Sequence, residues 1–164
     1  MADLDKPIFD TKAFRNACGK FAAGITVVTT EVDGEVHGMT ANGFMSVSLD
    51  PPLVVISVAK KAHLHSLIAQ SGTYAVSILS HKQEPYSGHF AGWPKAGFEP
   101  VFDQRNGYPV IADAIAYFVT KLYAVYEGGD HTLYLGQVDY FESNEPDPLL
   151  YYGGKYRWLR SVDS

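Results

Sequence analysis

The chain has 164 residues, of which 46% are hydrophobic and 19% charged, and this length and composition fit one globular domain with a sizeable core. Its formal net charge is −5 and its 13 Lys and Arg residues are scattered, which argues against the basic face that nucleic-acid binding requires. The single cysteine excludes an internal disulfide and a cysteine-rich zinc site.

The N-terminal segment is acidic and contains no apolar run, so we expect no signal peptide. No stretch approaches the roughly 20 apolar residues that a membrane-spanning helix needs. We therefore expect a cytoplasmic protein that binds neither nucleic acid nor membrane.

The first predicted element is a helix over residues 12–21, capped by Thr11 and ended by Ala22-Ala23-Gly24. Its helical spacing places four apolar side chains on one face, namely Phe14, Ala17, Cys18 and Phe21. We expect this face to be buried and Cys18 to be a structural thiol.

Runs of β-branched and aromatic residues between turn signals predict strands over residues 25–32, 44–49, 53–58, 74–79, 115–127 and 132–142. Asp33-Gly34 is a strong hairpin signal after the first of these strands. Short helices are expected over residues 63–70 and 81–90, and an ordered loop over 91–109. The aromatic tail at 149–159 is expected to pack on another surface. These elements predict a mainly β fold with flanking helices, an antiparallel barrel in one domain with a core at about 12–160.

The segment from His37 to Pro52 is the most informative motif, because it places bare backbone and neutral polar groups in one sharp turn between strands. Hydroxyl and amide side chains gather there, at Thr40, Asn42, Ser46 and Ser48. Such groups suit the carbonyls and ring nitrogens of a flavin, and hydroxyls suit phosphate oxygens. The alternative is an ordinary turn whose Ser and Thr satisfy their own backbone. No G-x-G-x-x-G follows a strand, so a Rossmann dinucleotide site and a P-loop are not expected.

Several fragments, in this order along the chain, resemble the small flavin reductases of two-component monooxygenases, above all the reductase partners of phenol and 4-hydroxyphenylacetate hydroxylases. The matching fragments cover residues 14–17, 21–30, 37–42, 45–52, 74–79, 89–92, 129–132, 136–138 and 148–152. The resemblance implies a single flavin reductase-like domain over 1–164 with the FMN-binding split β-barrel fold. It also implies a homodimer in which NADH or NADPH, usually NADH, reduces FAD or FMN, and release of the reduced flavin to a separate oxygenase component.

The resemblance also implies a set of site residues. Met39, Thr40, Ala41 and Asn42 would line the isoalloxazine, and Ser46, Val47 and Ser48 would lie toward the ribityl chain and phosphate. A phosphate-binding segment would contribute Ala59, Lys60, His63 and Ser66, although the family often has Thr or Ser where this chain has His63. Phe90, Tyr152 and Tyr156 would form aromatic walls, and His131 would be the catalytic residue in the nicotinamide pocket.

Elementary chemistry agrees with parts of this assignment and leaves alternatives open. A helix N-terminus beside a lysine attracts phosphate, and an imidazole at a strand end can hydrogen-bond a carboxamide. No acidic or thiol ligand lies at metal spacing beside His37 or His89, so no metal is expected. A flavin enzyme with another acceptor, such as a corrin ring, shares these motifs. A flavin-binding electron carrier is the non-enzymatic alternative, and the motif at 129–132 argues against it.

Overall fold

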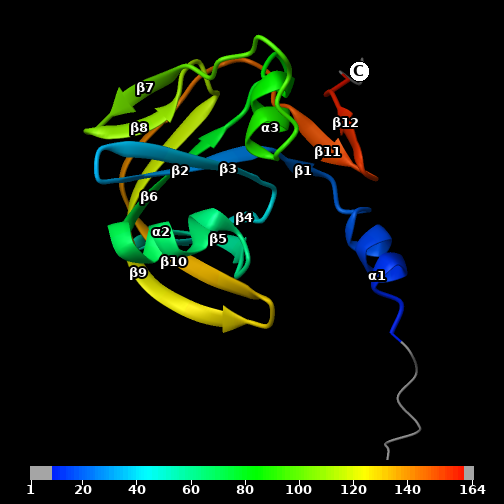
Figure 1. The fold of residues 1–164 in the computed structure, drawn as a ribbon, viewed down its shortest axis with the longest axis horizontal. Coiled ribbons are helices and arrows are strands. Elements are labelled where there is room, and N and C mark those ends of the chain that lie inside the picture. The colour runs from blue at the N-terminus through cyan, green and yellow to red at the C-terminus, as the bar shows by residue number, and fades with distance from the viewer. Residues whose placement is uncertain (1–8, 161–164) are drawn as a thin grey trace, which may run out of the picture.

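The structure is a computed structural model that describes residues 9–160 and contains three helices and twelve strands in that range (Figure 1). The helices are α1 (Thr11–Cys18), α2 (His63–Ser71) and α3 (Glu84–Phe90). The strands are β1 (Ala23–Gly24), β2 (Thr26–Val32), β3 (Glu35–Ala41), β4 (Phe44–Leu49), β5 (Pro52–Ala59), β6 (Thr73–Ile78), β7 (Phe102–Arg105), β8 (Tyr108–Ile111), β9 (Ala116–Gly128), β10 (His131–Ser143), β11 (Leu150–Tyr152) and β12 (Lys155–Arg157).

Seven strands form one antiparallel sheet in the order β3-β2-β6-β9-β10-β5-β4. The sheet curls around a core, and α2 covers its opening (Figure 1). Leu64 and Ile68 of α2 are buried against Val28, Ile56 and Tyr134 of the sheet. Because β3 and β4 remain edge strands, the barrel is split rather than closed. The predicted mainly β architecture is confirmed.

Local turn chemistry explains the hairpins on this sheet. Asp33 and Gly34 adopt positive φ angles of 53° and 77°, the conformation that a two-residue β-hairpin favours. The same geometry recurs at Asn106 and Gly107, with φ angles of 50° and 78°, and joins β7 to β8. The prediction of an ordered loop over 91–109 is therefore wrong for its second half, where Asn-Gly was an available hairpin signal.

The first helix corrects two further predictions. Asp10, not Thr11, caps α1: its Oδ1 accepts hydrogen bonds from the N–H groups of Lys12 and Ala13, both at 3.0 Å. The helix ends at Cys18, and none of its residues is buried. Cys18 is exposed, so the expected buried thiol is wrong. Within the described residues the apolar face of α1 is not packed into the core: Phe14 contacts the Phe9 ring, with centroids 5.4 Å apart, and is still 57% exposed.

Helix α1 belongs to a terminal arm, which we define as residues 9–24 and 149–160. In the arm, β1 pairs with β11 and β11 with β12. The N–H of Gly153 donates to the carbonyl of Gly19 at 2.9 Å. Leu149 anchors the arm, because it is buried beside Ile25 and Leu79. Beyond that anchor, α1 extends away from the sheet (Figure 1). None of the helices at 9–160 has the length and hydropathy to cross a membrane.

Candidate functional site

A pocket of about 490 Å³ lies along β3, between α2 and α3. This volume is in the range of small-molecule sites, which is about 300–1,000 Å³. Strand β3 pairs only with β2, so alternate residues of its other side present backbone N–H and C=O groups that no described strand uses. The pocket therefore offers main-chain donors and acceptors to a flat ligand, as the sequence predicted for this segment.

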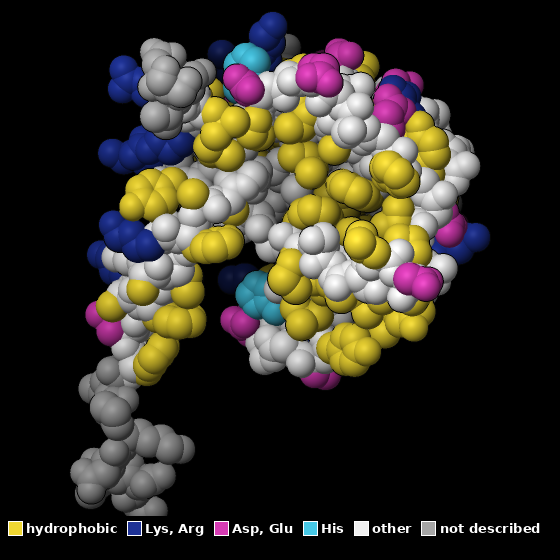
Figure 2. All heavy atoms as spheres, turned by 180° about the vertical axis from the view of Figure 1, so that it is seen from behind, with side chains coloured by type: hydrophobic (Ala, Val, Ile, Leu, Met, Phe, Trp, Pro, Cys, Tyr) yellow, Lys and Arg dark blue, Asp and Glu magenta, His cyan; other side chains and the backbone are white. Residues whose placement is uncertain are grey.

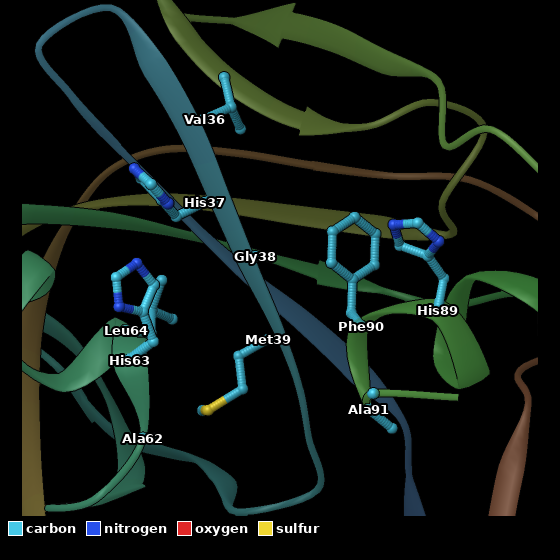
Figure 3. Close-up of a pocket in the computed structure, with 11 residues that line it drawn as sticks. Val36, His37, Gly38, Met39, Ala62, His63, Leu64, His89, Phe90 and Ala91 are labelled. Atoms are coloured by element: carbon cyan, nitrogen blue, oxygen red, sulfur yellow. The ribbon is translucent and has the colours of Figure 1, made fainter. Parts of the chain in front are cut away.

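Apolar side chains from three elements form the walls of the pocket. Met39 of β3 and Phe90 of α3 lie on opposite sides of the strand (Figure 3). A Cβ atom at Gly38 would come within 2.6 Å of the Phe90 ring, so only glycine lets this ring lie against β3. The Thr40 hydroxyl donates to the Ser87 carbonyl at 2.6 Å and ties α3 to the strand. The predicted residues Met39 and Phe90 thus share one pocket, and Thr40 positions its wall.

Three histidines also line this pocket (Figure 3). The rings of His37 and His63 meet edge to face, with centroids 5.3 Å apart. The Nδ1 atom of His89 is buried and has no hydrogen-bond partner within the described residues. From the sequence, a metal-ligand role for His37 and His89 was considered and rejected, and no other role was assigned to them. The alternation of side chains along a strand would have predicted the position of His37 better, because His37 lies two residues before Met39 and so faces the same side.

The start of α2 forms one end of the pocket. The cap residue Ala62 makes no side-chain hydrogen bond, and the first turn carries no acidic residue. The N–H of His65 donates to the Ala62 carbonyl at 3.0 Å, so the N–H groups of His63 and Leu64 are the ones that can meet an anion at the positive end of the helix dipole. His63 lines the pocket here, and the exposed Ser66 lies one turn further on. Ala59 and Lys60 precede the helix by a few residues and do not themselves line the pocket, which the predicted phosphate segment reaches through Ala62 and His63.

His131 begins β10 and pairs with Ala59, which places it beside the predicted phosphate segment. Its Nδ1 lies 2.7 Å from Oδ1 of Asp130. This contact lowers the pKa of the Asp130 carboxyl below its usual value. When Nδ1–H donates to Asp130, Nε2 is the ring nitrogen available to a ligand. Nearby, an ion pair with Lys60 lowers the pKa of Glu127.

The remaining predicted residues do not line the pocket along β3 in this single chain. Ala41 ends β3 and Asn42 begins the turn to β4. Ser46, Val47 and Ser48 lie on β4, where the pairing with β5 shifts register between Ser46 and Ser48. Tyr152 and Tyr156 belong to the terminal arm. Tyr156 reaches α3, where its hydroxyl donates to the Oγ of the buried Ser87 at 3.0 Å.

The residues present fit a flavin. The open edge of β3 supplies backbone groups for a ring with several donors and acceptors, and Met39 and Phe90 supply apolar contact. The start of α2 and Lys60 supply N–H groups and positive charge for a phosphate. His131 and Asp130 add a hydrogen-bonding pair next to that anionic end.

Comparison with known proteins places the chain among flavin reductases. A family profile described as a flavin reductase like domain matches residues 18–160. An NADH-dependent flavin reductase of a Rhodococcus species is 44% identical over 88% of this chain and 84% of its own length. The reductase component of 4-hydroxyphenylacetate 3-monooxygenase from Thermus thermophilus is 40% identical over 90% of this chain and 96% of its own.

The solved structures that superpose on this chain are also flavin reductases. The flavin reductase PheA2 in its native state superposes with a TM-score of 0.91 and 48% identity, covering 93% of this chain and all of the other. The NADH:FAD oxidoreductase SgcE6 of Streptomyces globisporus, in complex with NAD and FAD fragments, gives a TM-score of 0.87 at 37% identity over 97% of this chain and 100% of the other. The chain therefore belongs to the flavin reductase-like domain family and has its split-barrel fold, as the order of the motifs predicted.

Proposed function

We propose that the protein is an NADH-dependent flavin reductase that reduces FAD or FMN and supplies the reduced flavin to a separate oxygenase. The carrying observation is the pocket along the free edge of β3, bounded by the start of α2 and the Phe90 ring. It offers neutral backbone groups to a ring at one end and a helix N-terminus to a phosphate at the other. Relatives with this fold are named as NADH-dependent flavin reductases and as reductase components of monooxygenases.

Hydride transfer from nicotinamide to flavin is chemistry that the two bound cofactors supply. The residues of this chain would bind the flavin and the nicotinamide coenzyme and orient them. The β3 edge would hold the flavin ring, Met39 and Phe90 would give it apolar contact, and the α2 N-terminus would hold the phosphate. His131, held by Asp130, orients the nicotinamide through its free Nε2, which accepts from the carboxamide N–H. Rings that stack at about 3–3.5 Å need no side-chain acid or base for the transfer.

Steady-state oxidation of NADH with added FMN, FAD or riboflavin tests the proposal directly. We expect flavin-dependent loss of NADH absorbance with FMN and FAD. If neither NADH nor NADPH reduces any flavin at neutral pH, the protein is an electron carrier or uses another acceptor. An assay with a corrin acceptor and reduced flavin would then separate these two alternatives.

We also propose that the protein is a homodimer in which the terminal arm packs on the partner subunit. The apolar face of α1 exposes Phe14, and Phe21 follows it at 83% exposure. Hydrophobic side chains also gather on the rear face of the sheet, opposite the arm (Figure 2). Large exposed hydrophobic side chains occur on β4, β9 and β10, namely Met45, Val47, Leu49, Tyr123, Val125, Tyr126, Leu133 and Phe141. An apolar patch on this scale marks an interface, and a two-fold pair of chains would cover both surfaces.

Light scattering at micromolar concentration tests the dimer. We expect twice the mass of one chain for the wild type and a shift toward the monomer for Phe14→Glu. Val101→Glu is the matched control, because Val101 is similarly exposed, at 57%, but lies outside both surfaces. A wild-type monomer that still binds flavin would contradict the dimer. We propose in addition that the chain forms a single domain and that the protein is cytoplasmic.

A further inference from the structure

The lysine that the proposed function assigns to the flavin phosphate already has a partner in its own chain. Nζ of Lys60 forms an ion pair with Oε2 of Glu127 near the end of β9. The contact lowers the pKa of the Glu127 carboxyl, so Glu127 is anionic at neutral pH. The positive charge of Lys60, which lies shortly before α2, is therefore already paired with the Glu127 carboxylate.

The backbone fixes this pairing. Thr132 of β10 pairs with Val58 on one side and with Glu127 on the other. The main-chain N–H of Lys60 donates to the carbonyl of Asp130 at 2.9 Å. These contacts hold the backbone of Lys60 and the backbone of Glu127 close together, because β5, β10 and β9 are neighbouring strands. Glu127 is thus placed to compete with any anion that Lys60 binds.

We propose that Glu127 competes with the flavin phosphate for Lys60 and thereby keeps the flavin exchangeable. The proposal rests on the proposed function, because it requires that Lys60 binds the phosphate. A phosphate beside Lys60 must either displace the carboxylate or share the ammonium with it, and the two anions repel each other. Both outcomes weaken binding of a phosphorylated flavin and leave riboflavin, which has no phosphate, unaffected.

The exposure of the pair determines the size of the effect. The side chains of Lys60 and Glu127 are 43% and 75% exposed. Exposed ion pairs are weak and exchange readily with water and other ions. Glu127 therefore does not block the site but lowers its affinity by about two- to fivefold. For a reductase that hands its product to a separate oxygenase, this favours release of the flavin.

The test is a binding cycle with Glu127→Gln, Lys60→Ala and the double variant, read by flavin fluorescence with FMN, FAD and riboflavin. Glutamine keeps the shape of glutamate and removes its charge. Asp139→Asn is the matched control, because Asp139 pairs with Lys121 at 3.1 Å elsewhere on the sheet. Thermal unfolding of each variant checks that the fold is unchanged.

We expect Glu127→Gln to tighten FMN and FAD about two- to fivefold and to leave riboflavin unchanged. The gain should vanish when Lys60 is already alanine, and Asp139→Asn should change nothing. If Lys60→Ala weakens FMN selectively but Glu127→Gln has no effect or weakens it, the competition is refuted and the phosphate assignment stands. If Lys60→Ala affects all three flavins alike, the phosphate assignment itself fails, and the role of Glu127 fails with it.

Discussion

The two ends of the candidate site are built by different means. Along β3 the pocket depends on main-chain groups and on tight apolar packing, with Phe90 against Gly38. At the turn between β9 and β10 the site depends on exposed charges, where Lys60, Glu127, Asp130 and His131 meet. The first end is rigid and insensitive to salt, whereas the second is adjustable and screened. Substitutions at the two ends should therefore affect flavins with and without a phosphate differently.

The largest effect is expected at the packed end. Gly38→Ala introduces a Cβ atom at 2.6 Å from the Phe90 ring, so the ring must leave β3. Overpacking of this kind costs about 1–3 kcal/mol of stability. If the displaced ring carries this whole cost into the pocket, the loss of affinity is up to roughly 5- to 150-fold. FMN, FAD and riboflavin should weaken by the same factor in fluorescence titrations.

Gly24→Ala is the control for that experiment, because no atom lies within 4 Å of a Cβ built at Gly24. It should bind all three flavins like the wild type. Selective weakening of FMN by Gly38→Ala, with riboflavin unchanged, would place the phosphate rather than the ring along β3.

An intermediate effect is expected at the charged end. Lys60→Ala removes a charge-assisted hydrogen bond, and for this partly exposed side chain we expect about a tenfold loss for FMN and FAD and little change for riboflavin. The loss should shrink as salt is raised, because exposed charges are screened. Lys121→Ala provides a matched control on an exposed lysine that also holds a carboxylate. A loss independent of salt would argue against a charge interaction.

The smallest effect is expected at His131. Loss of one neutral hydrogen bond to the nicotinamide costs about 0.5–1.5 kcal/mol, or roughly 2- to 13-fold in KM for NADH or in the rate of hydride transfer. Flavin affinity should stay close to that of the wild type. Rapid mixing with NADH, followed by flavin bleaching, separates binding from transfer. Weaker flavin binding with an unchanged NADH dependence would assign His131 to the flavin end.

Sequence reasoning predicted the parts of the fold that short-range rules decide. Asp33-Gly34 indicated a hairpin, and runs of β-branched and aromatic residues indicated the strands β2, β9 and β10. The sequence could not show that the amphipathic face of α1 stays exposed in the described part of the chain, because periodicity indicates an apolar face but not what covers it. That limit explains the wrong expectation for Cys18.

The site divides in the same way. Met39, His63 and Phe90 were predicted from motifs and lie together in one pocket. His37 and His89 were missed as pocket residues, because histidine is found in metal sites and on exposed surfaces as often as in the wall of a ligand pocket. The pairing of Glu127 with Lys60 spans 67 residues of sequence and depends on the register of three strands, which no local pattern specifies.

The unpaired side of β3 has a consequence for the empty protein. An open strand edge is a template on which another chain can add a strand, and proteins usually protect such edges. Here the pocket leaves part of the edge open to receive a ligand. A flat coenzyme seated along it would occupy the same donors and acceptors that an intruding strand would use. We therefore expect the bound coenzyme also to protect this edge from self-association. Removal of the coenzyme should increase aggregation of the protein under conditions in which its fold is unchanged.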